Sequence, residues 1–349
     1  VVICDHTSGY YGKYKLLPTL VQLQSDITSP FPPLDLMVHI GEISAASFND
    51  TIPAKEVWRV SEDGELRDPF KKLTTVFQMS EEMFFLHYGK DGCNRHVLID
   101  ECRELFGEIY EQIPELPFCN IWTAMQLSSR LPKGALFHMG VSNTRRCWNM
   151  FQLPESVESA CNVGCCGIDG CVSTLVGASL VNPDRLCYVV VGDLTFFYDL
   201  NSLGNHHIGT NLRVMLVNNG RGTEFRLGIH HCNVFGDDAD KYMAAAGHFG
   251  NKSPLLVKHY AEDLGFHYLS ATTKEEFMTA LSNFTNPQLS DHSMILEVFT
   301  DSKDESEALY LMSHIQSDAK GMVRSKLKDA VRNVAGEKGI NAIKKILKK

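Results

Sequence analysis

The sequence predicts an α/β protein with two doubly wound, mainly parallel-sheet domains and a basic helical tail. Short runs of Val, Leu and Ile alternate with longer amphipathic stretches, which is the pattern of parallel strand–helix units. The runs are apolar at nearly every position, as expected of strands buried on both faces. With 349 residues, the chain is long enough to form more than one α/β core.

Residues 1–88 are predicted to form the first domain. The chain opens inside a strand-like run, so we expect this domain to be incomplete at its N-terminus. Its elements are predicted, in order, as a strand over Leu34–Ile40, a helix over Glu42–Phe48 and a strand over Val57–Val60 that ends in a turn at residues 62–64. A linker is expected near residues 88–94.

Residues 89–316 are predicted to form the second domain. Helices are expected over Glu101–Gln112 and Asn120–Leu131. The predicted strands that follow run straight into polar loops, and they are Ala135–Met139, Leu186–Val191, Leu212–Val217 and Met294–Phe299. Open parallel sheets bind ligands at the carboxyl ends of their strands, so we expect the functional site in these loops.

The third segment, residues 317–349, is a basic tail. It carries ten Lys and Arg residues against three acidic residues, with apolar residues at helical spacing. A helix packed on its own subunit accounts for this pattern, and so does contact with a membrane surface or an acidic partner. The other 316 residues carry 23 basic and 39 acidic residues, which disfavours binding of nucleic acid by the main body.

The composition favours a cytoplasmic protein with reduced thiols. No apolar run approaches the roughly 18 residues that span a bilayer, and no signal-type segment opens the chain. The eleven cysteines are odd in number and lie mostly in apolar surroundings. Cys161, Cys165, Cys166 and Cys171 are spaced too closely for the usual structural zinc site, which needs separated pairs.

Asp193 and Asn219 are the strongest candidate site residues. They lie 26 residues apart, each just past a predicted buried strand, and one crossover of that length can bring the two loops together. A carboxylate, an amide oxygen and a main-chain carbonyl suit Mg²⁺ and leave room for phosphates. Alternatively, Asp193 only caps a helix and the Asn218–Asn219 pair only turns the chain.

The finer pattern resembles a known family. Gly192–Asp193 followed by Asn218–Asn219 resembles the thiamine-diphosphate binding motif. Together with Gly167–Gly170 and the unusual Leu194, it is similar to 2-succinyl-5-enolpyruvyl-6-hydroxy-3-cyclohexene-1-carboxylate synthase of the menaquinone pathway. The likeness covers roughly residues 1–315. It implies that residues 1–88 are the middle domain and residues 89–316 the thiamine-diphosphate-binding domain of such an enzyme.

The resemblance also implies roles for individual residues. Asp193, Asn219 and the carbonyl of Arg221 would ligate Mg²⁺, and Ile168 would support the thiazolium ring of thiamine diphosphate. The remaining implied cofactor-binding residues are Gly167, Gly192, Leu194, Thr195 and Phe225. By the same resemblance, Ser142 and Arg146 match substrate-contacting positions. An arginine suits such a position, because it can bind a carboxylate through two parallel hydrogen bonds.

Two departures from the family pattern bear on activity. Val163 stands where the family has an arginine for a substrate carboxylate, so we expect either a different substrate or compensation by Arg145. The family's pyrimidine-binding domain, which carries the activating glutamate, has no counterpart in the chain, so we expect no turnover by the chain alone.

Two functions remain open at this point. One is a thiamine-diphosphate- and Mg²⁺-dependent decarboxylase or carboligase that acts on a 2-oxo acid. The other is a non-catalytic module with an assembly or regulatory role. For the enzyme, the resemblance implies at least a homodimer that includes pyrimidine-binding domains. We expect its contact near Asp169–Gly177 and Phe196–Leu203, with apolar surface around Leu194–Tyr198 buried by the partner.

Overall fold

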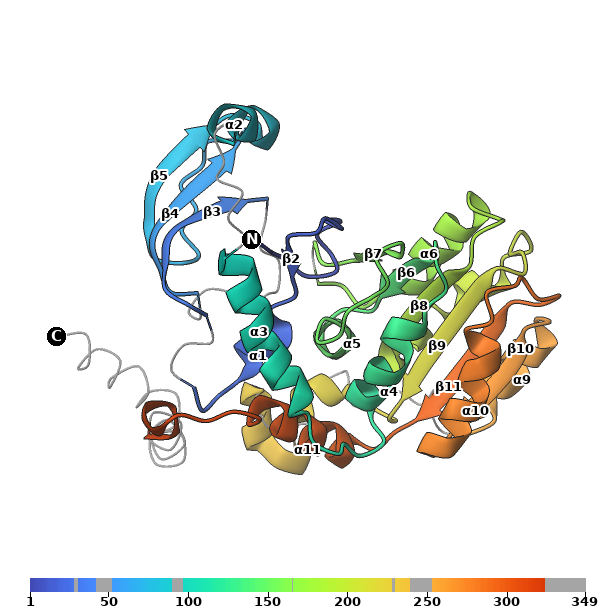
Figure 1. Cartoon of the computed structure of the whole chain (residues 1–349). Coiled ribbons are helices and arrows are strands. Elements are labelled where there is room, and N and C mark those ends of the chain that lie inside the picture. The colour runs from blue at the N-terminus through green and yellow to red at the C-terminus, as the bar shows by residue number, and fades with distance from the viewer. Residues whose placement is uncertain are drawn as a thin grey trace. The chain divides into compact units, whose positions relative to one another are not determined.

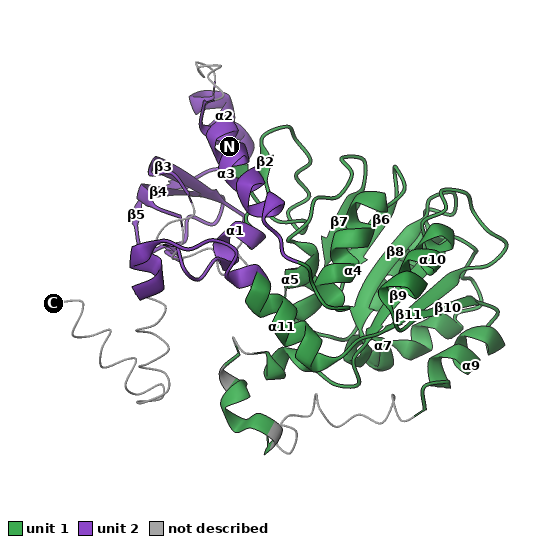
Figure 2. Ribbon diagram, turned by 60° about the horizontal axis from the view of Figure 1, so that its bottom comes forward, with its two compact units in different colours: residues 1–19, 115–311 green, residues 20–114, 312–349 purple. Residues whose placement is uncertain are grey.

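The computed structural model describes residues 1–27, 31–41, 52–89, 97–164, 166–227, 230–238 and 253–323. The chain divides into two compact units (Figure 2). Unit 1 consists of residues 1–19 and 115–311, and unit 2 consists of residues 20–114 and 312–349.

Unit 1 is built on a six-stranded, fully parallel sheet (Figure 1). The strands are arranged in the order β10-β11-β9-β8-β6-β7. Their bounds are Leu136–Met139 for β6, Glu158–Cys161 for β7, Cys187–Gly192 for β8, Leu212–Asn218 for β9, His267–Ala271 for β10 and Met294–Phe299 for β11. The predicted α/β class with parallel sheets is confirmed.

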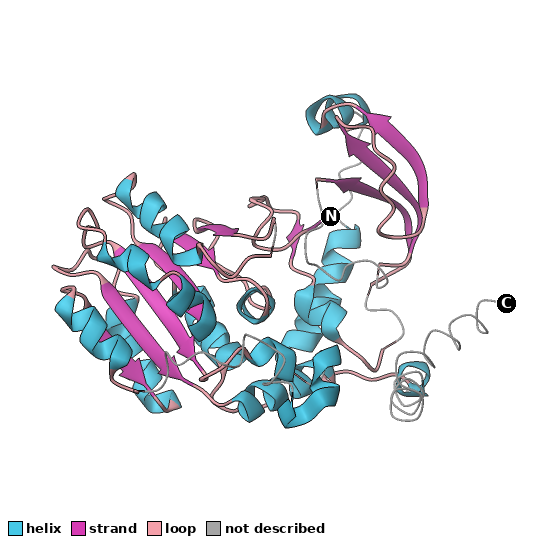
Figure 3. Cartoon of the chain, turned by 180° about the vertical axis from the view of Figure 1, so that it is seen from behind, coloured by secondary structure: helices cyan, strands magenta, loops and turns pink. Residues whose placement is uncertain are grey.

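Helices cover both faces of this sheet (Figure 3). On one face, alternate residues of β8, β9 and β11 pack against α6 (Cys171–Leu180), α7 (Asp193–Tyr198) and α9 (Leu256–Asp263). On the other face, aromatic contacts join the strands to α5 (Asn143–Trp148) and α10 (Lys274–Phe284): the Phe137 and Trp148 rings lie 5.0 Å apart, and the Tyr188 and Phe284 rings 5.5 Å. Trp122 of α4 (Asn120–Leu127) contacts Phe277 of α10. Because helices cover both faces, the central strands are buried on both sides, and this accounts for their nearly continuous apolar sequences.

The strand order creates a switch point beside β6. From β6 the chain first crosses to β7 at one edge, then returns to place β8 on the opposite side of β6. At such a point two neighbouring loops diverge in opposite directions and leave a crevice, which is where open α/β sheets bind ligands. The loops after β6 and β8 therefore lie where a ligand site is expected.

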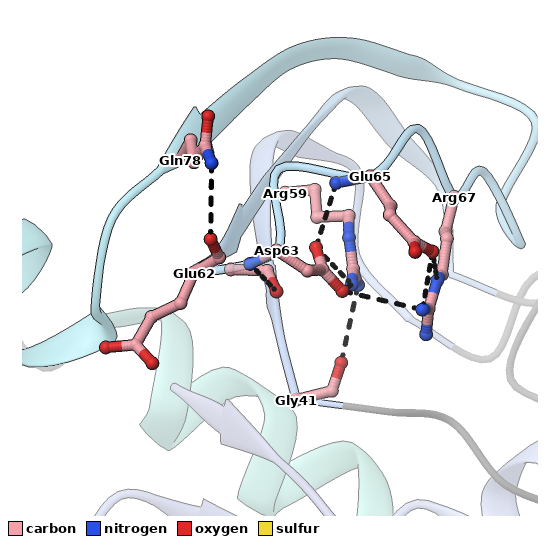
Figure 4. A network of polar contacts seen from close by, with 8 residues as sticks. Gly41, Arg59, Glu62, Asp63, Glu65, Arg67 and Gln78 are labelled. Atoms are coloured by element: carbon pink, nitrogen blue, oxygen red, sulfur yellow. Dashed lines mark hydrogen bonds and ion pairs between the residues drawn. The ribbon is translucent and has the colours of Figure 1, made fainter.

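Unit 2 contains a three-stranded parallel sheet of β3 (Leu34–Ile40), β4 (Ala54–Ser61) and β5 (Leu73–Gln78), accompanied by α2 (Glu81–Tyr88) and α3 (Val97–Glu111). The buried Arg59 of β4 donates to the Asp63 carboxylate at 3.2 Å and to the Gly41 carbonyl at 3.5 Å (Figure 4). The Asp63 carboxylate also accepts the backbone N–H of Glu65 at 2.8 Å, so it closes the turn after β4. Gly64, with φ +64°, supplies the left-handed conformation that this turn needs.

The remaining elements are short or join the main ones. They are β1 (Val2–Ile3), β2 (Lys15–Leu16), α1 (Thr19–Leu23), η1 (Ser128–Arg130), η2 (Leu200–Gly204), η3 (Thr223–Arg226), η4 (His231–Asp238) and α11 (Ser302–Ser313). In the part of the chain that the structure describes, no helix is both long and apolar enough to cross a bilayer.

The division into units differs from the predicted boundaries at 88 and 316. Residues 1–19 pack with the six-stranded sheet, because the backbone N–H of His6 donates to the Asn149 side chain at 2.8 Å and the His6 ring contacts the Phe151 carbonyl at 2.8 Å. Helix α3 belongs to unit 2, where Phe106 packs on Phe31. The predicted helix Glu42–Phe48 and the tail beyond residue 323 lie outside the described residues.

Candidate functional site

The two halves of the motif lie at one edge of the sheet. Strands β8 and β9 are neighbours and parallel, with Gly192 paired to Val217. Asp193 follows Gly192 directly, and Asn218 and Asn219 follow Val217, so both loops leave the sheet at the same edge. Strand β6, on the other side of β8, ends there as well, since Gly140 N–H donates to the Val190 carbonyl at 2.7 Å.

Asp193 begins helix α7 and is 2% exposed. One oxygen of its carboxylate accepts the backbone N–H of Leu194 at 2.8 Å. Burying a carboxylate is costly unless charge or hydrogen bonds compensate it, so a buried aspartate at a strand end is a candidate for cation binding. A side-chain carbon at Gly192 would meet no heavy atom within 4 Å, which shows open space beside this backbone. Leu194 and Thr195 are buried in the protein.

The Asn218–Asn219 loop is a tight turn. The Asn218 side-chain oxygen accepts Gly220 N–H at 3.2 Å, and the Asn219 side-chain oxygen accepts Arg221 N–H at 3.3 Å. Gly220 has φ +80°, a conformation that favours glycine. The turn-forming role considered from sequence is therefore present, and it leaves the second lone pair of the Asn219 oxygen for another ligand. The hydroxyl of buried Thr223 has no hydrogen-bond partner among the described residues.

Glu297 of β11 supports this turn and was not predicted from sequence. Its carboxyl group accepts the Asn218 amide at 2.7 Å and the Tyr268 hydroxyl at 2.7 Å. Burial raises the pKa of Glu297, while these two hydrogen bonds act in the opposite direction. The signal for it was a single acidic residue inside the apolar run Met294–Phe299.

The loop after β6 is strained at Ser142, which has φ +60° although it is not glycine. Strained backbone of this kind tends to cluster at functional sites. A Cβ at the neighbouring Gly140 would lie 3.3 Å from the Val190 carbonyl oxygen, so the β6 end approaches β8 closely. Helix α5 follows and carries Arg145 and Arg146.

Both of these arginines pair with acidic residues of the chain itself. Arg145 donates to the Asp5 carboxylate at 3.2 Å. Arg146 forms a two-pronged pair with Glu224, with N–O distances of 2.6 and 3.0 Å. Glu224 lies in η3, after the Asn218–Asn219 turn, and sequence reasoning missed it because nothing local distinguishes it from a solvated loop glutamate.

The other predicted residues lie in neighbouring segments. Ile168 and Gly167 are half-buried in the loop before α6. The N-terminal turn of α6 is held by Asp199, whose carboxylate accepts Ser173 N–H at 2.7 Å. The Phe225 ring packs on His230 at 5.1 Å.

A site of this composition differs from a His/Cys metal centre. Among the residues that the structure describes, no group of three or more His, Cys, Asp and Glu side chains is placed to hold a metal. Cys165 of the cysteine-rich segment lies outside those residues. The ligands implied by the sequence, which are the Asp193 carboxylate, the Asn219 amide oxygen and the Arg221 carbonyl, would be an oxygen-only set with a single carboxylate, and a set of this kind suits Mg²⁺.

The sequence of the chain is similar to those of known proteins. The chain is 33% identical over 263 residues to 2-succinyl-5-enolpyruvyl-6-hydroxy-3-cyclohexene-1-carboxylate synthase of Bacteroides fragilis, a match that covers 74% of this chain and 45% of that protein. The chain resembles this synthase. The synthase of the same name from Phocaeicola vulgatus is 32% identical over 265 residues, covering 74% of this chain and 44% of the relative. No family model matches the chain.

The relatives are longer than the part that matches. The chain spans less than half the length of these synthases. A relative from Christiangramia forsetii, 33% identical, matches over 199 residues, which is 57% of this chain and 33% of that protein. The resemblance to the synthase therefore concerns one portion of it.

Proposed function

We propose that the chain is the cofactor-binding part of a thiamine-diphosphate- and Mg²⁺-dependent enzyme. This enzyme would remove the carboxyl group of a 2-oxo acid and add the remaining acyl unit to an acceptor. The observation that carries the proposal is the pairing of β8 with β9, which brings the loops of Asp193 and Asn219 to one edge of the sheet. The resemblance to the synthase over 74% of the chain supports it.

The residues at this edge fit the cofactor. The buried Asp193 carboxylate, the Asn219 amide oxygen and the Arg221 carbonyl would hold Mg²⁺, whose preferred ligands are oxygens. The Thr223 hydroxyl, which lacks a partner among the described residues, is suited to donate to a phosphate oxygen. Ile168 would offer apolar contact to the thiazolium ring, and Phe225 would line the pocket. When bound, thiamine diphosphate supplies the nucleophilic carbon and the electron sink that the reaction needs.

A non-catalytic module is the second candidate. The internal pairing of Arg145 with Asp5 and of Arg146 with Glu224 favours it, because these arginines are the expected contacts for substrate. A measurement of cofactor binding distinguishes the two candidate functions, because only the enzyme requires the cofactor.

The metal site can be tested by removing its one carboxylate. We expect Asp193→Ala in the intact protein to abolish Mg²⁺-dependent binding of thiamine diphosphate, measured by isothermal titration calorimetry, while far-ultraviolet circular dichroism stays unchanged. Asp184→Ala, which removes an exposed aspartate ahead of β8, is the matched control and should bind normally. Unchanged affinity in Asp193→Ala would refute the assignment.

A further inference from the structure

The Arg146–Glu224 pair joins the loops on either side of β8. Arg146 lies on α5, after β6, and Glu224 lies in η3, after β9, while β8 stands between β6 and β9 in the sheet. The pair therefore spans the end of β8, where Gly192 and Asp193 leave the sheet. It belongs to the candidate site and is no remote surface contact.

Glu224 binds the end of the Arg146 guanidinium group that carries the two terminal nitrogens. Both terminal nitrogens of Arg146 donate to the two Glu224 oxygens, and one of them also contacts the Asn143 side-chain oxygen at 3.4 Å. Only 24% of the Arg146 side chain and 20% of the Glu224 side chain are exposed, so water screens the pair weakly. Burial alone would lower the pKa of Arg146, but the Glu224 carboxylate raises it above its ordinary value.

A ligand carboxylate would meet little positive charge here. A ligand carboxylate can bind both terminal nitrogens of Arg146 only if it displaces Glu224. If Glu224 stays in place, the ligand meets an ion pair with no net charge. Arg145 does not compensate, because it donates to the Asp5 carboxylate at 3.2 Å. Val163, in the loop after β7, adds no charge. The expectation that Arg145 substitutes for an arginine at position 163 is therefore not supported by its contacts.

We propose that Glu224 is a specificity-determining residue: by occupying Arg146, it directs the site to 2-oxo acids and acceptors that carry no second carboxylate at this position. This rests on the proposed function, which supplies the 2-oxo acid as substrate class. The site would then accept a 2-oxo monocarboxylate with an uncharged side chain and would gain no affinity from a second carboxylate.

Two five-carbon probes test the proposal without turnover. Glutarate carries two carboxylates and pentanoate carries one, and their binding to the intact protein can be followed by calorimetry or by ligand-observed NMR. We expect the wild-type protein to bind both within about threefold of each other. Glu224→Gln frees Arg146 and should tighten glutarate by about tenfold or more, since a charge-assisted contact is gained, and pentanoate by less, since its single carboxylate reaches Arg146 only by leaving the position that it occupies in the wild-type protein. In Glu224→Gln/Arg146→Gln the gain should vanish.

The double variant also guards against misfolding of the first. Glu224→Gln/Arg146→Gln keeps the pair neutral and should bind glutarate within about threefold of the wild type, whereas Arg146→Gln alone leaves the Glu224 carboxylate uncompensated and should weaken glutarate. A tenfold loss of glutarate affinity in the double variant, or a wild-type protein that prefers glutarate tenfold, would overturn the proposal. So would a folded Glu224→Gln that shows no gain up to the solubility limit of glutarate. A glutarate gain in a protein that does not bind thiamine diphosphate would refute the proposed function and leave the role of Glu224 standing.

Discussion

Charge pairing between distant segments engages both arginines of the candidate site. Asp5, which is 140 residues away in sequence, holds Arg145, and Glu224 holds Arg146. Arg146, which matches a substrate-contacting position of the family that the chain resembles, and its neighbour Arg145 are thereby engaged in internal contacts. The same residue types would bind an anionic substrate if their acidic partners were absent.

Position 163 offers a test of substrate choice. We expect the complete enzyme to convert isochorismate and 2-oxoglutarate poorly, and Val163→Arg to raise kcat/KM for that pair by about 30-fold, since a charge-assisted contact contributes about 2 kcal/mol. Val163→Met, which is long but uncharged, is the control and should not improve the reaction. Efficient turnover of this pair by the wild-type enzyme would show that the substitution is compensated elsewhere.

Single residues were predictable from sequence where a motif fixes their place. Asp193 and Asn219 follow apolar strands at a spacing that one crossover explains, and the structure brings their loops to one edge. Glu224, Asp5 and Glu297 were not predicted, because their roles arise from partners 78, 140 and 79 residues away. The residues adjacent to them in sequence do not indicate which distant side chain each will contact.

Helix α11 contributes a buried carboxyl group, that of Glu305, which forms hydrogen bonds to two other segments of the chain. Glu305 accepts the backbone N–H of Asn120 at 2.9 Å and the Thr300 hydroxyl at 2.9 Å, so it connects α11 to the start of α4. Burial raises the pKa of Glu305 to about 7 from an ordinary 4.5, against the effect of these hydrogen bonds. Between these two pH values the folded protein keeps a proton that the unfolded chain releases.

Glu305 should therefore contribute a loss of stability as pH rises from about 4.5 to 7, because its carboxyl group keeps its proton in the folded state and releases it in the unfolded chain. Burial lowers the pKa values of His6 and His138 to about 4, which acts in the opposite direction, so the contribution of Glu305 is measured as a difference between two proteins. We expect the free energy of unfolding of Glu305→Gln, measured by urea denaturation, to rise relative to that of the wild type across this window, by up to about 3 kcal/mol at pH 8. Glu307→Gln, an exposed residue of the same helix, serves as control. A difference between Glu305→Gln and the wild type that stays constant from pH 5 to 8 would contradict the account.

Strands buried on both faces were predictable. Strand β11 has the predicted bounds, Met294–Phe299, and β6, β8 and β9 agree within one residue at each end. Strand β3 also has its predicted bounds, Leu34–Ile40, although several of its residues are exposed. Strands β7 and β10 were not predicted, because they lie at the edges of the sheet and several of their residues are exposed. The predicted helix Asn120–Leu131 ends as an α-helix at Leu127 and continues as a 3₁₀ turn.

At the level of the whole molecule, the proposed dimer contact needs one correction. Leu194 and Phe196, expected to be covered by a partner, are already buried within the chain, and Phe196 packs in one core cluster with residues of α6 and β8. Tyr198, at the end of α7, remains 63% exposed, and a hollow lined by Ser173, Val176, Gly177 and Ser202 lies between α6 and η2. The proposed two-fold contact thus centres on α6 and η2.

Two helical glycines allow a matched test of that contact. A Cβ at Gly177 of α6 or at Gly107 of α3 would meet no heavy atom within 4 Å, so a glutamate fits at either position. We expect the wild-type protein to be a dimer by multi-angle light scattering at micromolar concentration. Gly177→Glu should weaken it by placing like charges across the two-fold axis, and Gly107→Glu should not. A wild-type monomer would mean that these elements do not hold the subunits together.

The division of the chain was the least predictable feature. Residues 1–19 join unit 1 through contacts with residues near 150, which no linker composition reveals. Apolar patterning identifies strands and helices, but contacts made across more than 100 residues decide which of them form one core.

The most direct test of the central claim is to locate the metal. Mn²⁺ replaces Mg²⁺ at oxygen sites and scatters anomalously, so crystals grown with thiamine diphosphate and Mn²⁺ would show the ion in an anomalous difference map. The account predicts one strong peak, coordinated by the Asp193 carboxylate, the Asn219 amide oxygen and the Arg221 carbonyl. A map without a peak at these oxygens, although the ion and the cofactor were present in excess, would contradict it.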